Sequence, residues 1–253
     1  MNKWRVVRLL EKKVRRGDIL RLISGEDLGV QKSLFEGDAL GKLSDRYKEV
    51  GVGVMLVGDK NYPEELGNIA DPPVCLFYKG EPSILKDKCV AVIGSRDQSP
   101  RGIRATKRIV PELVKQGFVI VSGLALGTDS QAHRVCLGCG GKTVAVMPVG
   151  LDMVYPARHQ RLAEEIVDKG GLLLSEYPFG TEIFKFRFLE RNRIVSGLSR
   201  ATLVVEAGKP SGATATANFA IDQGREVWVS RGRRGEKNSE GILNLIEDGA
   251  RII

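Results

Sequence analysis

Short apolar runs alternate with longer amphipathic stretches from residue 89 onward. The runs are rich in Val, Ile and Leu and occupy residues 89–93, 118–121, 143–147, 172–174, 202–205 and 226–229. The stretches between them have the length and spacing of helices, at residues 101–116, 129–137, 158–169, 188–198 and 211–223. Apolar strands that alternate with helices are typical of a parallel sheet that is buried on both faces. The pattern therefore predicts an α/β fold with a mostly parallel sheet.

The first part of the chain lacks this regular alternation. Residues 17–50 contain scattered apolar positions and several glycines, so we expect short helices and turns there. Two apolar runs, at residues 52–57 and 74–78, predict strands. We therefore predict a short helical N-terminal extension over residues 1–50 and a larger domain over residues 51–253.

Residues 1–16 predict a basic amphipathic helix. Trp4, Val7, Leu10 and Val14 fall near one face, and most of the charged side chains fall on the other. Three interpretations fit this pattern: a helix docked on the rest of the protein, an arm that contacts phosphates, and a helix on a membrane surface. The pattern favours the docked helix.

The charge of the chain favours a polyanionic partner. The net charge is +8 and the isoelectric point is about 9.4. Most of the excess lies at one end, because residues 1–16 hold seven basic side chains against Glu11 alone. The four cysteines suggest no disulfide framework, the basic N-terminus does not resemble a signal peptide, and no run approaches the roughly 20 apolar residues of a membrane span. We expect a cytoplasmic protein without a membrane anchor.

Small residues follow several of the predicted strands. Gly94-Ser95-Arg96 follows the first of the regular runs, Gly123 and Gly127 belong to the turn after the second, and Ser211-Gly212 opens the last helix. The carboxyl ends of parallel strands share one edge of the sheet, where ligands bind. Backbone N–H groups at glycine turns and helix starts bind anions there, and Arg96 adds a forked donor. Alternatively, the glycines only close tight turns.

The common nucleotide and catalytic signatures are incomplete. No G-x-G-x-x-G follows the apolar run at residues 89–93, as a dinucleotide site would need. Gly141-Lys142-Thr143 resembles the end of a P-loop but precedes a predicted strand instead of a helix. Ser122 lacks the glycine two positions earlier that a nucleophile elbow needs. His133, Cys136 and Cys139 do not share one helix face, and no second cluster completes a metal site. We therefore predict no catalytic residue, no metal site and no cofactor.

Residues 184–193 combine aromatic and basic side chains, reading Phe-Lys-Phe-Arg-Phe-Leu-Glu-Arg-Asn-Arg. Proteins bind single-stranded nucleic acid with this combination, because cations track the phosphates while rings stack on bases, at about 1–3 kcal/mol per base. Alternatively, the phenylalanines fill the core and the cations are solvated. The segment as a whole favours single-stranded nucleic acid.

Over roughly residues 50–250 the chain resembles the DprA/Smf family of DNA-processing proteins. The resemblance depends on the order and spacing of many short motifs, each of which is weak alone. These are Tyr62-Pro63 with Asp71-Pro72-Pro73; Val92-Ile93-Gly94-Ser95-Arg96; Val121-Ser122-Gly123-Leu124-Ala125 with Gly127, Asp129 and Ala132-His133; Gly150-Leu151-Asp152 with Tyr155-Pro156; Ser175-Glu176-Tyr177-Pro178; Phe188 with the stretch from Arg191 to Ser199; Val205-Glu206-Ala207 with Ser211-Gly212; Gly224-Arg225-Glu226-Val227; and Asn244-Leu245-Ile246 with Asp248-Gly249-Ala250.

The resemblance implies an extended Rossmann-like fold that binds single-stranded DNA, forms a homodimer and loads a RecA-type recombinase in natural transformation, without enzymatic activity. It carries the family's DNA pocket over to Arg96, Lys185 and Phe188. Together with the strand-end turns and the basic-aromatic segment, the predicted nucleic-acid-binding residues are Gly94, Ser95, Arg96, Gly123, Gly127, Lys185, Phe188, Arg191, Asn192, Arg193, Ser211 and Gly212.

Two other functions remain open. One is a nucleotide-binding sensor or a phosphoribohydrolase-like enzyme on a related Rossmann fold. Those enzymes carry a Pro-Gly-Gly-x-Gly-Thr turn, and the corresponding residues 208–213 read Gly-Lys-Pro-Ser-Gly-Ala. The other is an adaptor that keeps the fold for protein contacts alone.

Overall fold

A computed structural model describes residues 2–26 and 39–253. The described strands form one nine-stranded sheet in the order β1-β2-β6-β5-β4-β3-β7-β8-β9. The strands are β1 (Gly53–Leu56), β2 (Cys75–Gly80), β3 (Cys89–Ile93), β4 (Val119–Ser122), β5 (Thr143–Met147), β6 (Leu172–Ser175), β7 (Ala201–Val204), β8 (Glu226–Val229) and β9 (Arg251–Ile252). Strands β3 to β9 pair in parallel, whereas β1 and β2 form an antiparallel edge. The predicted α/β fold with a mostly parallel sheet is confirmed.

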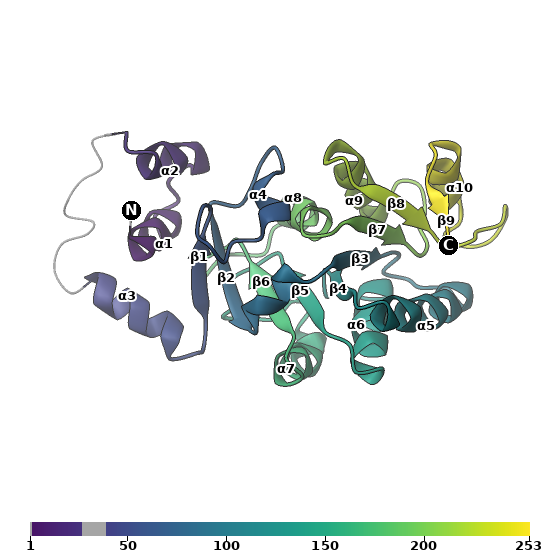
Figure 1. Ribbon diagram of the computed structural model, residues 1–253, viewed down its shortest axis with the longest axis horizontal. Helices are drawn as coiled ribbons and strands as arrows, with labels where there is room; N and C mark the ends of the chain where they lie inside the picture. The colour runs from purple at the N-terminus through teal and green to yellow at the C-terminus, as the bar shows by residue number, and fades with distance from the viewer. Residues whose placement is uncertain (1, 27–38) are drawn as a thin grey trace.

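The chain winds in two directions from β3. It first builds β4, β5 and β6 on one side, and then crosses back to build β7, β8 and β9 on the other. Helices α5, α6 and α7 cover one face of the sheet and α8, α9 and α10 the other (Figure 1). Their bounds are α5 (Pro100–Lys115), α6 (Thr128–Gly138), α7 (Gln160–Asp168), α8 (Lys185–Gly197), α9 (Gly212–Asp222) and α10 (Glu240–Glu247). A doubly wound sheet has a crevice where the strand order reverses, here between β3 and β7.

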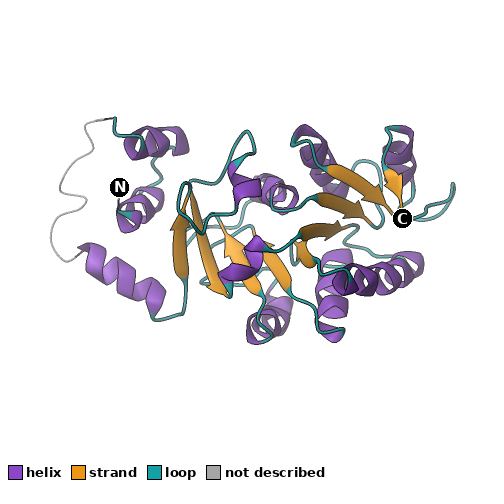
Figure 2. Cartoon of the chain, in the orientation of Figure 1, coloured by secondary structure: helices purple, strands orange, loops and turns teal. Residues whose placement is uncertain are grey.

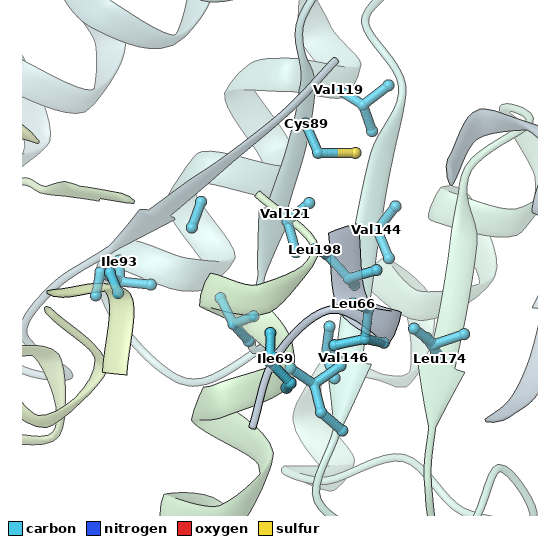
Figure 3. Close-up of a cluster of buried hydrophobic side chains, with 14 of the residues drawn as sticks. Leu66, Ile69, Cys89, Ile93, Val119, Val121, Val144, Val146, Leu174 and Leu198 are labelled. Atoms are coloured by element: carbon cyan, nitrogen blue, oxygen red, sulfur yellow. The ribbon is translucent and has the colours of Figure 1, made fainter. Parts of the chain in front are cut away.

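The alternation of side chains along β3 explains why the sheet is buried on both faces. Val90 and Val92 pack against α5 and α6, whereas Ala91 and Ile93 belong to the core on the opposite face. Residues two apart in a strand share a face, so a run that is apolar at every position can bury both sides. Figure 3 shows the core on this opposite face, which includes Val121, Val146 and Leu198, the residue that follows α8. Each fully buried side chain of this kind contributes roughly 1.5–3 kcal/mol to folding.

The N-terminal segment is docked on the antiparallel edge. Helix α1 (Lys3–Glu11) ends five residues before the predicted helix does, and α2 (Arg16–Ile23) follows after a turn in which Lys13 has a φ of 57°. The single helix predicted over residues 1–16 was therefore wrong. The turn brings both helices onto one core, where Val7 and Ile19 are fully buried. The docked interpretation of the amphipathic pattern is confirmed.

The core between the N-terminal helices and the antiparallel edge contains stacked aromatic rings. The Tyr47 ring of α3 (Ala39–Lys48) lies 3.8 Å from the ring centroid of Phe179 and 5.3 Å from that of Phe77. Phe77 belongs to β2, so the N-terminal helices share a core with the edge of the sheet. The division of the chain at residue 50 stays a prediction. The short helices expected over residues 17–50 are found as α2 and α3, and residues 27–38 lie outside the described part.

Most predicted elements lie within three residues of their expected bounds. Figure 2 shows the observed helices and strands. Helix α8 begins at Lys185 rather than 188, so the basic-aromatic segment is itself helical. The short helix α4 (Glu64–Gly67), the 3₁₀ turns η2 (Pro82–Lys86) and η3 (Ala157–His159), α10 and β9 were not predicted. Within the described residues, no helix has the length and apolar character to cross a membrane.

Candidate nucleic-acid interface

A cavity of about 410 Å³ opens at the carboxyl ends of β3 and β4, in the crevice where the strand order reverses. The starts of α8 and α9 complete its wall. The predicted residues that line it are Gly94, Ser95, Arg96, Gly123, Lys185, Phe188, Arg191, Asn192, Ser211 and Gly212. Turns that are far apart in the sequence therefore meet in one place. Gly127 and Arg193 do not line this cavity.

Arg96 and Phe188 form the aromatic side of the cavity. The Cζ atom of Arg96 lies 5.4 Å from the centroid of the Phe188 ring, in a cation–π arrangement. Tyr155 meets the same ring edge to face, with centroids 5.3 Å apart. Arg96 is exposed and Phe188 is half-buried, so both are accessible to a ligand. The pair offers a positive charge and a ring side by side.

The starts of two helices supply further groups. Lys185 opens α8 and is exposed. The Ser211 hydroxyl accepts a hydrogen bond from the Thr214 N–H (3.1 Å), which caps α9. The Asn192 side chain donates to the Gly212 carbonyl at 3.4 Å and links the two helices. The first N–H groups of a helix have no partner within it and carry partial positive charge, so the start of α9 is suited to an anion.

Two buried side chains of opposite charge, Arg191 and Asp129, line the cavity. Arg191 is 4% exposed and donates through Nη1 to the Val146 carbonyl, while its Nε has no partner in the described structure. Burial lowers the pKa of Arg191 to about 10, although the Asp129 carboxylate acts in the opposite direction. Burial raises the pKa of Asp129, which Arg191 and two backbone N–H groups oppose. At neutral pH Arg191 therefore remains charged beneath the cavity.

Gly123 and Gly127 were predicted to help form an anion site, but the structure gives each of them a packing role. The Gly123 N–H already donates to Asp129 at 3.2 Å, and a Cβ at Gly123 would overlap the Arg191 guanidinium. Gly127 has a φ of 72°, and a Cβ there would collide with the backbone of Ser95 and Arg96. These two glycines allow close packing between turns, which is the alternative that the sequence left open.

Arg193 lies on the other side of α8 from the cavity. Its side chain is 7% exposed, and the guanidinium makes a forked pair with Glu176 together with a contact to Asp71. Residues two apart in a helix point in nearly opposite directions, so Arg191 and Arg193 cannot both face one ligand. Arg193 was predicted to lie with the DNA-contacting residues, but the structure places it away from them.

Several lining residues were missed by the sequence analysis. Leu189 and Val195 belong to the same face of α8 as Lys185 and Asn192, at helical spacing. Extending the predicted helix back to Lys185 identifies them by periodicity alone. Asp129 lines the cavity too, and its signal was its place directly after the glycine turn.

The residues considered for catalysis have structural partners. The Ser122 hydroxyl donates to the Val92 carbonyl at 2.7 Å. His133 is fully buried, and its Nδ1 lies 2.7 Å from the Thr143 hydroxyl, which itself donates to the Ile120 carbonyl. The histidine must therefore donate from Nδ1, and burial lowers its pKa to about 3. Neither group lines the cavity.

Comparison with known proteins places this geometry in a family. The family model for DNA recombination-mediator protein A matches residues 53–253. The Smf protein of Synechocystis sp. is 42% identical over 199 residues, which cover 77% of this chain and 50% of that protein. The DNA processing protein DprA of Streptococcus pneumoniae is 42% identical over 195 residues, covering 77% of this chain and 68% of that protein. The chain thus spans about half the length of the Smf relative.

Solved structures agree. The crystal structure of DprA from Streptococcus pneumoniae is similar with a TM-score of 0.79 at 36% identity, covering 100% of this chain and 90% of that one. DprA from Helicobacter pylori, described for its single-stranded DNA binding mode, has a TM-score of 0.72 at 33% identity over 80% of this chain and 90% of that one. The match over the whole Rossmann-like region confirms the resemblance read from the sequence. The chain belongs to the DNA recombination-mediator protein A family, with the DprA and Smf DNA-processing proteins.

Proposed function

We propose that this chain is a non-enzymatic protein that binds single-stranded DNA in the cavity between the starts of α8 and α9. One observation carries the proposal: Arg96 stands beside the Phe188 ring, and Lys185 lines the same cavity at the reversal point of the sheet. Cations beside an accessible ring match a strand whose phosphates and bases are both exposed. The single-stranded DNA binding described for the Helicobacter pylori relative supports the same ligand.

Family membership supports a proposal for the cellular role. We propose that the protein protects incoming single strands in the cytoplasm and helps load a RecA-type recombinase in natural transformation, acting as a homodimer. Membership of the recombination-mediator family supports this role. Sedimentation of the purified chain tests the dimer. Acceleration of recombinase filament growth on DNA covered by single-strand-binding protein tests the loading step.

An enzyme of the phosphoribohydrolase type has less support at this site. Such an enzyme needs a catalytic glutamate near the turn after β7. Glu206 lies there, but it is fully buried and accepts hydrogen bonds from the Ser99 N–H (2.9 Å) and hydroxyl (2.6 Å). It holds Ser99, the N-cap residue of α5, and does not line the cavity. Release of free base from nucleoside monophosphates by the purified protein would favour the enzyme.

The experiment that tests the proposed function compares single-stranded and duplex oligonucleotides of equal length at several salt concentrations. Stacking requires bases that are already free, so the single strand should bind more tightly at every salt concentration. Equal affinity for the two forms would remove the main support for this function.

A further inference from the structure

Two phenylalanine rings at the start of α8 lie in solvent beside the candidate cavity. Phe184 is 44% exposed and Phe186 is 54% exposed. Their rings stack on one another, with centroids 5.6 Å apart and planes inclined by 13°. Ile183 and Leu189 are exposed next to them. Single exposed apolar residues need no explanation, but a contiguous group of them marks a binding surface.

Arg187 holds the two rings in place. Its Cζ atom lies 5.3 Å from the Phe184 centroid and 5.7 Å from the Phe186 centroid. The same guanidinium lies 5.0 Å from the ring of Tyr177 and donates to the Glu182 carbonyl at 2.8 Å. The rings are therefore ordered before any ligand arrives, which lowers the entropy cost of binding to them.

The ring pair is continuous with the cavity. Lys185 stands between Phe184 and Phe186 in the chain. Both Lys185 and Leu189 line the cavity. A strand with one phosphate at Lys185 would therefore pass beside the exposed rings. The basic groups here are Lys185 and Arg187, and the nearby acid Glu190 accepts a hydrogen bond from the Tyr177 hydroxyl at 2.8 Å.

We propose that Phe184 and Phe186 form an aromatic platform on which bases of the same single strand stack after the strand leaves the cavity. This inference rests on the proposed function. The chemistry favours nucleic acid over a protein partner, because nearly parallel rings with basic side chains beside them match unpaired bases joined by phosphates. The platform adds a second binding subsite that lies outside the cavity.

We expect the bound strand to end at the platform. On its far side lies a second cavity of about 340 Å³, which Phe184 and Arg187 also line. Three basic side chains, Lys13, Arg16 and Arg187, face three acidic ones there, Glu11, Glu176 and Glu182. This balance gives phosphates no net attraction, so the strand is not expected to continue toward the N-terminal helices.

The test is the length dependence of binding by Phe184→Ala and Phe186→Ala variants. Thymidine oligonucleotides of about four and about sixteen nucleotides span the site sizes of single-strand-binding proteins. Each variant should bind the longer strand about tenfold more weakly and the shorter strand as wild type does. Ile221→Ala is the matched control, because Ile221 is 51% exposed on α9 and does not line the cavity. Its affinity should not change.

A second measurement uses the wild-type protein and so does not depend on any variant folding. A sixteen-nucleotide strand that keeps bases only in its central four positions should bind as weakly as the four-nucleotide strand does, after allowance for its extra phosphates at high salt. The Phe186→Ala variant should bind this abasic strand as wild type does. Phe186→Tyr should keep full affinity for the intact strand, because the ring is retained.

Several outcomes would overturn the platform. These are an equal loss on both strand lengths, no loss on the longer strand, an undiminished loss on the abasic strand, or a change in self-association of the protein without any length dependence. The proposed function is checked separately. If Lys185→Ala leaves binding of the four-nucleotide strand unchanged, the cavity itself is not the site, whatever the platform variants do.

Discussion

The Arg193 guanidinium and the Glu176 carboxylate form a forked ion pair, with Nη1–Oε1 at 2.6 Å and Nη2–Oε2 at 2.7 Å. Both side chains are buried, and Arg16 of α2 approaches the same carboxylate at 3.4 Å. The pair thus joins α8, the end of β6 and the N-terminal helices. It separates the two arginines of the Arg-Asn-Arg motif into one that faces the cavity and one that stabilises the fold.

Arg193→Met should therefore affect stability rather than DNA binding. Removing one partner of a buried pair costs about 3–5 kcal/mol of unfolding free energy, and we expect about 3 because Arg16 still compensates Glu176. Chemical denaturation measures this loss. At a temperature where the variant is folded, the slope of log K against log salt for single-stranded DNA should match that of the wild type. A shallower slope would return Arg193 to the binding site.

Arg96→Ala should weaken DNA binding by about 1.5–3 kcal/mol, the value of a hydrogen bond to a charged group. Arg101→Ala is the matched control. Arg101 starts the next helix, donates to the Arg231 carbonyl at 2.6 Å and does not line the cavity. Titration by fluorescence anisotropy compares the two variants. Wild-type affinity in both of them would exclude the Gly-Ser-Arg turn from the site.

Lys185→Ala and Phe188→Ala should separate charge from stacking. If Arg96, Lys185 and Arg191 each neutralise one phosphate, the slope of log K against log salt should be about −2, since each contributes about −0.7 on single strands. Lys185→Ala should make the slope shallower by about 0.7. Phe188→Ala should weaken binding with the slope unchanged, because stacking releases no ions. A changed slope in Phe188→Ala would contradict a stacking role.

Neutralising the exposed basic residues of the N-terminal segment tests whether binding is a diffuse effect of charge. Deleting residues 1–16 would uncover the core that buries Val6 and Val7, so substitution is cleaner. The triple variant Lys12→Ala, Lys13→Ala, Arg15→Ala removes three exposed charges. We expect its salt slope on single-stranded DNA to stay within about 0.3 of wild type. A slope that became shallower by about 2 would place the binding site on the N-terminal helices.

His133 predicts a loss of stability in acid. The folded pKa of about 3 lies below the ordinary value of 6.5, chiefly because burial disfavours the charged ring. Between these values the unfolded chain binds a proton that the folded chain does not. The unfolding free energy should therefore fall as the pH falls through this window, by about 1.4 kcal/mol per pH unit for one proton.

The control for this prediction is His133→Asn, which keeps a donor for the Thr143 hydroxyl and cannot titrate. Its unfolding free energy, measured by denaturant titration between pH 4 and pH 6, should have a slope smaller than the wild type by that amount. Parallel slopes for the two proteins would mean that His133 does not remain neutral in the folded state.

The sequence by itself determined the fold class and most of the candidate site. Apolar runs such as Cys89–Ile93 identify strands that are buried on both faces, because a local period of two is a property of the chain alone. The turns after those strands had to converge, because parallel strands end at one edge. That argument reached Arg96 and Gly123, and the basic-aromatic segment reached Lys185 and Phe188, all of which line one cavity.

Tertiary structure alone decided which partners each side chain has. Periodicity places Arg191 and Arg193 on opposite sides of α8, but only packing shows that Glu176 faces one and the cavity the other. The Gly123 N–H is held by Asp129, and the first helix ends at Glu11 so that two helices can share one core. These outcomes depend on contacts between residues far apart in the chain, and local propensity contains no information about such contacts.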